Sequence, residues 1–200
     1  MDRMTESSHA LTLLLGDTPP RADAERNVEA LLTATREFVL AGELNPSAAQ
    51  LAAAAGVGVG TLYRRALGKE ALLAAAVIDL LDEVSARASR EATGASWPAF
   101  EEFAIDYLRI REITCSLTHS LDGEFDGGVA GAKRRARAAF ETLTARLHAA
   151  GLLAEEVDAA ELMVLLASID ITDDTLGLSP NRKRRERVAR RMLASLRAAG

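Results

Sequence analysis

The chain has 200 residues, of which 48% are hydrophobic and 26% are charged. These values are typical of a globular protein with enough apolar residues for one or two folded domains. The formal net charge is −5, which excludes a basic field over the whole molecule. Any surface for nucleic acid must therefore be local.

The N-terminal region and the cysteine count indicate the compartment. Cys115 is the only cysteine, which excludes an intrachain disulfide and is typical of a reducing cytoplasm. The apolar run at residues 10–15 is too short to cross a bilayer, so we expect neither a signal peptide nor a membrane partner. Residues 1–20 end in two prolines and are interpreted as a mobile arm. We therefore expect a cytoplasmic protein.

Helical spacing of apolar residues begins directly after this arm. One face of a first helix carries Val28, Leu31, Leu32, Thr35 and Val39. Gly42 is predicted to end that helix. Ser47 and Gln50 have the spacing of a capping box, which predicts a short alanine-rich helix that ends near Gly56. A further short helix is expected to contain residues 61–65.

The rest of the chain continues the helical pattern. After Gly68 the spacing predicts helices over residues 69–92, 96–110, 132–150 and 159–171, with a last helix that Ser179 and Pro180 begin. Asp158 and Glu161 form a second capping pair. The sequence shows no alternating strand pattern. It thus predicts an all-α protein with a small unit at residues 21–67 and a larger helical bundle at residues 68–200.

Three alternating glycines, Gly56, Gly58 and Gly60, raise the question of a phosphate-binding loop. A dinucleotide fingerprint requires G-x-G-x-x-G after a strand, whereas here G-x-G-x-G follows a helix. A P-loop is excluded because Gly68-Lys69 is followed by Glu70. A helix-turn-helix explains the pattern better: Gly56 permits a left-handed turn between two helices. Gly60 has no side chain, so the second helix can approach a DNA backbone closely.

The segment "QLAAAAGVGVGTLYRRALGKEALLAAA" resembles the signature of the tetracycline-repressor (TetR) family of bacterial transcription regulators. The residues that match its pattern directly are 55–57, 60–63, 69 and 70, within a region of similarity over about residues 21–77. Three positions depart from the pattern: Gly58 replaces a serine N-cap, Arg65 replaces histidine and Ala66 replaces phenylalanine. Our hypothesis is that Leu67 turns inward beside Ala66 and fills the space of the missing ring.

The resemblance implies a homodimer that binds a double-stranded DNA operator. It favours a repressor over an activator. The residues expected to contact DNA are Ser47, Gly60, Thr61, Tyr63, Arg64, Arg65 and Lys69. Among them Thr61 and Arg64 are candidates for base edges, and the others for the phosphate backbone. The alternative for Tyr63 is a core aromatic residue. The alternative for the two arginines is ordinary surface charge.

The larger bundle is expected to hold the effector site and the dimer interface. The candidates for contact with an unknown small apolar or amphipathic effector are Trp97, Phe100, Phe103, Tyr107, Cys115, Phe125, Phe140 and Leu143. The alternative for all of them is core packing. Residues 159–171 and 188–199 are predicted to form the dimer interface, because the first of these helices is apolar on nearly every face.

Other candidate sites are weaker. Cys115 and His119 offer too few ligands for a metal site, and "DGEFDG" has Lys133 where a calcium loop requires glutamate. Residues 182–191 carry a net charge of +6, which indicates a nucleic-acid patch or a solvated helix face. We find no paired acid–base constellation, and we expect no cofactor and no enzyme activity. The competing hypothesis is a helical enzyme or small-molecule carrier that has lost DNA binding.

Overall fold

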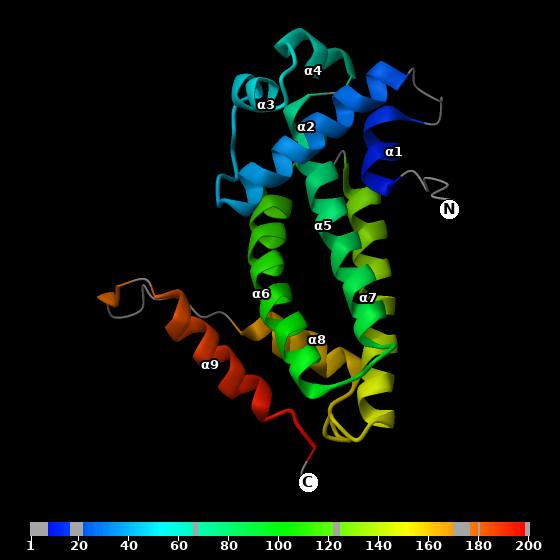
Figure 1. Cartoon of the computed structure of the whole chain (residues 1–200), viewed down its shortest axis with the longest axis vertical. Helices are drawn as coiled ribbons and strands as arrows, with labels where there is room; N and C mark the ends of the chain where they lie inside the picture. Colours follow the sequence, from blue (N-terminus) through cyan, green and yellow to red (C-terminus); the bar gives the residue numbers. More distant parts are fainter. Residues whose placement is uncertain are drawn as a thin grey trace. The chain divides into compact units, whose positions relative to one another are not determined.

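The computed structural model describes residues 8–16, 22–65, 68–121, 125–169, 177–179 and 181–198. In these ranges the chain is helical and forms no β-strand, which confirms the all-α prediction (Figure 1). The helices in chain order are α1 His9–Leu15, α2 Ala22–Leu40, α3 Ala48–Ala54, α4 Val59–Arg65, α5 Lys69–Glu91, α6 Trp97–Ser120, α7 Asp126–Ala149, α8 Ala159–Ser168 and α9 Arg182–Ala194.

The chain divides into two compact units. The first unit contains residues 1–82 and 112–133, and the second contains residues 83–111 and 134–200. The sequence analysis predicts a domain boundary after residue 67. In the division into compact units, the first half of α5 falls in the same unit as the helices before it. Residues 71–78 of α5 are all buried, so this segment is surrounded by neighbours on every side rather than on a single face.

Reciprocal capping boxes mark where two of the helices begin. The hydroxyl of Ser47 accepts a hydrogen bond from the backbone N–H of Gln50, and the Gln50 side chain accepts one from the backbone N–H of Ser47. Asp158 and Glu161 form the same reciprocal pair at α8. Both capping boxes predicted from the sequence are thus confirmed.

Helix α1 lies where the sequence was interpreted as a mobile arm. Ser8 caps it by accepting a hydrogen bond from the backbone N–H of Leu11, and Ala10, Leu11 and Leu14 are buried. The arm interpretation is therefore wrong for residues 9–15: the apolar run is one buried face of a short amphipathic helix that contacts α2. Residues 1–7 and 17–20 lie outside the described residues.

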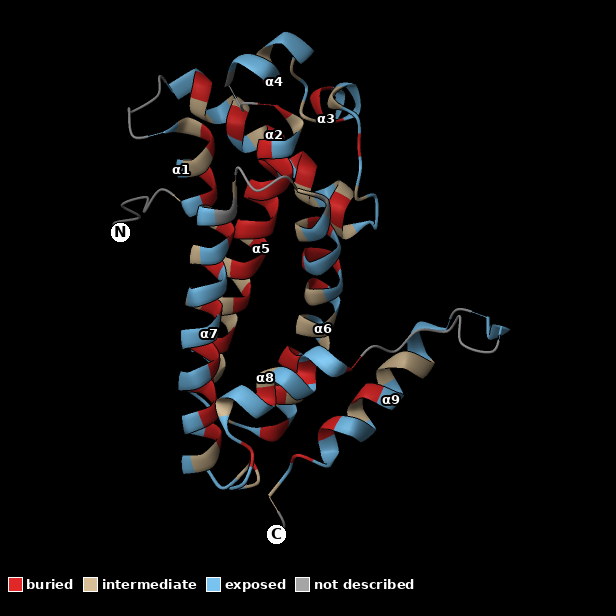
Figure 2. Ribbon diagram, turned by 180° about the vertical axis from the view of Figure 1, so that it is seen from behind, coloured by how far each residue is buried: buried red, intermediate tan, exposed pale blue. Residues whose placement is uncertain are grey.

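The core of the first unit joins α2, α3 and α4, which contact one another. Val28, Leu31 and Val39 are fully buried along one face of α2, as the apolar spacing predicts. Thr35 is buried on the same face, and its hydroxyl donates to the carbonyl oxygen of Leu31 at 2.7 Å. Figure 2 shows this buried face in red against the exposed outer face of α2.

Candidate nucleic-acid interface

The turn between α3 and α4 depends on one glycine. Gly56 has φ +67°, in the left-handed region that L side chains rarely adopt. The backbone N–H of Val57 donates to the carbonyl oxygen of Ala52 at 2.9 Å, and that of Gly56 donates to Ala53 at 3.1 Å. This is the hydrogen-bond pattern of a Schellman C-cap, which reverses the chain within two residues and directs it into α4.

Helix α4 has one face toward the core and one toward solvent. Leu62 is fully buried, and with the buried Leu51 and Ala52 of α3 it forms the inner face of the motif. Tyr63 is 60% exposed and Arg64 is exposed as well, whereas Thr61 is half-buried. The exposure of Tyr63 excludes the alternative of a core aromatic residue.

Arg64 and Gly60 lie together on the exposed side of α4. The guanidinium Nε of Arg64 donates to the carbonyl oxygen of Gly60 at 3.1 Å. Gly60 is exposed, and a Cβ placed there would meet no heavy atom within 4 Å. The protein interior therefore does not require glycine at this position.

The two predicted phosphate anchors outside α4 already have local partners. The hydroxyl of Ser47 donates to Oε1 of Gln50 at 2.7 Å as part of the capping box. Nζ of Lys69 donates to Oδ1 of Asn45 at 2.8 Å and lies 3.9 Å from a carboxylate oxygen of Glu70. Each must share or exchange these contacts in order to bind a phosphate.

Three predictions concern residues beyond the described part of the interface. The side chain of Arg65 and all of Ala66 and Leu67 lie outside the described residues, so the hypothesis of an inward-turned Leu67 stays a prediction. The next residue, Gly68, has φ +106° and is buried. The chain thus enters α5 through a conformation that favours glycine.

Val59 is a candidate that sequence reasoning missed. It is the first residue of α4 and is 41% exposed. Val59 and Tyr63 are four residues apart and so share one helix face. That spacing was the available signal, and an exposed apolar side chain at this place can contact the methyl group of thymine.

Comparison with known proteins supports this motif as a regulator's DNA-binding element. Residues 30–76 match the family model for bacterial regulatory proteins of the tetR family, and this span covers α3, α4, their turn and parts of α2 and α5. Residues 30–76 thus form a helix-turn-helix of the TetR type. The match supports a transcription regulator that binds DNA through this element.

Solved structures of TetR-family proteins have a similar fold over most of their length. The TetR transcription regulatory protein from Mycobacterium vanbaalenii is 28% identical, with a TM-score of 0.64, over 90% of this chain and 100% of that chain. A TetR transcriptional regulator from Streptomyces coelicolor is 21% identical, with a TM-score of 0.55, over 86% and 99%. A TetR-family regulator from Marinobacter aquaeolei is 18% identical, with a TM-score of 0.55, over 90% and 100%. A comparison with curated proteins finds no significant match.

The second unit of the chain contains an aromatic cluster built from α6 and α7. The ring of Phe140 lies 5.5 Å from that of Phe103 and 4.9 Å from that of Tyr107, and Trp97 lies 5.3 Å from Phe100. All of these rings are buried except that of Tyr107, which is half-buried. Leu143, one turn after Phe140, is fully buried. Six of the eight effector candidates thus belong to one unit.

The other two effector candidates belong to the first unit. Cys115 is exposed, so its side chain lines no enclosed space within the chain. Phe125 is half-buried and directly precedes α7.

Among the described residues, no three His, Cys, Asp or Glu side chains are grouped as a metal site would require. No described helix combines the length and apolar character of a membrane span.

Two arginines lie against rings of the aromatic cluster. The guanidinium of Arg87 lies 6.0 Å from the ring centre of Phe103 and donates to Asp106 at 2.8 Å. The guanidinium of Arg197 lies 5.7 Å from the ring centre of Trp97. Cations at these distances are attracted to the faces of the rings. Two cations therefore border the cluster, although its rings are mostly buried.

Helix α9 is held to α6 by one arginine. Arg190 donates to Oε1 of Glu102 at 2.6 Å and also pairs with Glu101. Both hydrogen bonds raise the pKa of the Arg190 guanidinium, and the bond to Glu102 contributes more than the bond to Glu101. Of the seven cations that make residues 182–191 basic, Arg190 thus acts as a structural residue within the second unit.

Apolar side chains remain exposed on α8 and α9. Val164 is 62% and Leu165 40% exposed on α8, while Val188 is 37% and Met192 44% exposed on α9. Val188 and Met192 are four residues apart and share a helix face. In contrast, Leu196 is 8% exposed and belongs to the chain's own core. Leu165 is thus placed to meet a partner, whereas Leu196 is not.

Proposed function

We propose that the chain is a ligand-responsive repressor that binds a palindromic operator as a homodimer and is released by a small apolar or amphipathic effector. The observation that supports DNA reading best is the exposed face of α4. There Val59, Tyr63 and Arg64 project from a helix that is anchored by the buried Leu62. A short helix after a tight turn, with one side buried and the other open, suits insertion into a major groove.

Base reading is assigned to two residues of α4. Arg64 can donate two hydrogen bonds to O6 and N7 of guanine once it leaves the carbonyl oxygen of Gly60. Thr61 can contact the methyl group of thymine. Tyr63 and Arg65 are assigned to phosphates from the reading helix itself, and Ser47 and Lys69 from the starts of α3 and α5.

Dimer formation is supported by the exposed apolar side chains of α8 and α9. Four of these side chains, Val164, Leu165, Val188 and Met192, remain exposed in the single chain. A second copy related by a two-fold axis would cover the same surface on both chains. Two reading helices would then face two half-sites of a palindrome.

Release by an effector is assigned to the aromatic cluster. Tyr107 is its half-buried member and contacts the buried ring of Phe140. An apolar or amphipathic compound that inserts beside Tyr107 would replace ring contacts with ligand contacts. It would favour those conformations of the second unit that accept it, and it would release DNA if their reading helices no longer match the operator.

The test of DNA reading compares two alanine variants on the chain's own upstream DNA and on a scrambled site. Arg64→Ala should weaken binding to the operator by about 1–3 kcal/mol and relax the preference at one base position per half-site. Lys69→Ala should weaken binding to both DNAs alike and reduce the slope of log affinity against log salt concentration by about one. Arg137→Ala, which changes an exposed arginine of α7 in the second unit, is the matched control and should leave binding unchanged.

The same experiment distinguishes the proposal from its rival. A carrier or enzyme that has lost DNA binding would bind operator and scrambled DNA equally weakly, with no difference between Arg64→Ala and the control. Equal losses for Arg64→Ala and Lys69→Ala on both DNAs would contradict the division of roles between them.

A further inference from the structure

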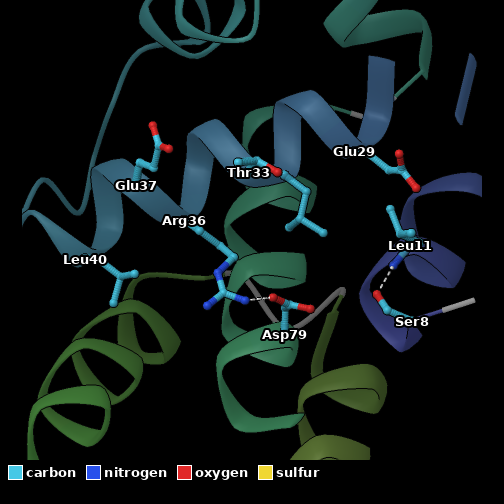
Figure 3. A pocket seen from close by; sticks show the side chains of 9 residues that line it. Ser8, Leu11, Glu29, Thr33, Arg36, Glu37, Leu40 and Asp79 are labelled. Atoms are coloured by element: carbon cyan, nitrogen blue, oxygen red, sulfur yellow. Dashed lines mark hydrogen bonds and ion pairs between the residues drawn. The ribbon is translucent and has the colours of Figure 1, made fainter. Parts of the chain in front are cut away.

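An open groove of about 520 Å³ lies in the first unit beside α2 (Figure 3). It is separate from the aromatic cluster, and its walls come from α1 with its cap, α2 and α5. Leu11 of α1 and Leu32 and Leu40 of α2 supply its apolar lining.

One ion pair lies on the α5 side of the groove. Nη1 of Arg36 pairs with Oδ2 of Asp79, and the two side chains are 27% and 21% exposed. This pair joins α2 to α5, and Figure 3 shows it below α2. Within this pair the two charges compensate each other.

Among the lining residues that the structure describes, the remaining charges are negative. Glu29 and Glu37 also line the groove and are exposed. In the described part of the chain neither carboxylate has a hydrogen-bond or ion-pair partner. Figure 3 shows the Glu37 carboxylate directed away from the Arg36–Asp79 pair, whereas that of Glu29 is directed toward α1 beside Leu11. Glu29 is thus the carboxylate that borders the apolar part of the groove.

We propose that this groove binds a small organic monocation with a short apolar body. The ammonium group would lie at Glu29, and the apolar body would lie on Leu11 and Leu32 toward the Arg36–Asp79 pair. Glu29 and Arg36 are seven residues apart on α2, which corresponds to about 10 Å along the helix axis. A body of that length joins the two ends of the groove. A carboxylate ligand would instead meet the like charge of Glu29.

This site goes beyond the proposed function, because the effector assigned above belongs to the second unit. The groove's own elements are all in the first unit. Occupation would add contacts among α1, α2 and α5, and a ligand that binds only the folded chain raises its melting temperature. The proposal therefore has a readout that needs no DNA.

Three probes of equal length and different charge test the site in the full chain. They are 4-phenylbutylamine, the neutral 4-phenylbutan-1-ol and the anionic 4-phenylbutyrate, each titrated by calorimetry and followed by thermal shift. The amine should bind at millimolar concentration or below and about two- to fivefold more tightly than the alcohol, which is the range of an exposed ion pair. The carboxylate should bind more weakly than both.

Variants then locate the binding. Glu29→Gln should abolish the preference for amine over alcohol, and Thr33→Phe, which changes an exposed residue of the lining, should fill the groove and remove the binding of both. Glu25→Gln, one turn earlier on α2 and outside the lining, is the matched control and should leave both affinities unchanged. Circular dichroism of each variant confirms that it is folded.

The proposal is overturned if the amine does not bind at 1 mM or binds no better than the alcohol. It is also overturned if Glu29→Gln keeps the preference, or if a folded Thr33→Phe binds the amine as the wild type does, since the probe then lies elsewhere. None of these results depends on operator binding, so a failure here leaves the proposed repressor function untouched, and the reverse also holds.

Discussion

Gly60→Ala separates the stability of the fold from DNA recognition, because the two should change in opposite directions. Gly60 is the second residue of α4, is exposed and has no positive φ. A Cβ placed there meets no heavy atom within 4 Å. The folded chain thus has room for the methyl group.

The magnitude follows from helix propensity. Glycine is less favourable than alanine by about 0.8–1.0 kcal/mol in a helix interior, and the first turn gives a smaller difference, so we expect a gain of about 0.5–1 kcal/mol. For a chain of this size that raises Tm by roughly 1–4 °C. DNA affinity should fall roughly tenfold, because a methyl group that keeps the backbone from the phosphates removes contacts of about 0.5–1.5 kcal/mol each.

Gly127→Ala provides the matched control. Gly127 is the second residue of α7, is exposed, and its Cβ would also meet nothing within 4 Å. Both variants should therefore raise Tm by similar amounts in a thermal melt. Only Gly60→Ala should weaken binding to operator DNA in a fluorescence-anisotropy titration.

Two results would refute this reasoning. If Gly60→Ala lowers Tm while Gly127→Ala raises it, Gly60 has a structural role that its open surroundings do not indicate. If Gly60→Ala is more stable and binds DNA as tightly as the wild type, the Gly60 side of α4 does not approach DNA. The assignment of α4 residues to bases would then have to change.

Three further predictions follow from the described contacts. Gly56→Ala should lower the free energy of unfolding in urea by about 1–2 kcal/mol, because φ is +67° and an alanine is strained there. No neighbour lies within 4 Å, so a steric clash adds nothing to this cost. A neutral result would contradict a left-handed turn. Leu165→Glu should keep the helical circular dichroism but give monomers by sedimentation, whereas Leu162→Glu, at a fully buried position, should unfold the chain; a monomeric wild type would remove the dimer proposal. Arg190→Met should cost about 1 kcal/mol or less, because its side chain is 35% exposed, and equal losses in low and high salt would argue against ion pairing.

Much of the fold was predictable because it depends on neighbours within one helical turn. Ser47 and Gln50, and likewise Asp158 and Glu161, form capping boxes from side chains three residues apart. Gly56 allows the turn by its own φ, whatever the rest of the chain does. The helix-turn-helix and the family resemblance therefore follow from the local sequence.

The candidate site was predictable only in part. The position of α4 in the sequence and the burial of Leu62 follow from helical spacing. The hydrogen bond between Lys69 and Asn45 does not, because it joins residues that are 24 positions apart. Val59 is exposed although it is a valine, and Cys115 is exposed although free cysteines are commonly buried. Residue type alone does not determine these exposures, because they depend on which other helices cover each position.

The sequence by itself determined the helical class, the caps, the tight turn and the helix that would read DNA, since each depends on local backbone preference and on apolar spacing. Only the tertiary structure decided that α1 packs on α2, that Arg36 of α2 pairs with Asp79 of α5, and that Leu165 is exposed while Leu196 is buried. These outcomes depend on contacts between segments far apart in the chain, and an apolar periodicity shows that a face will be covered without showing by what.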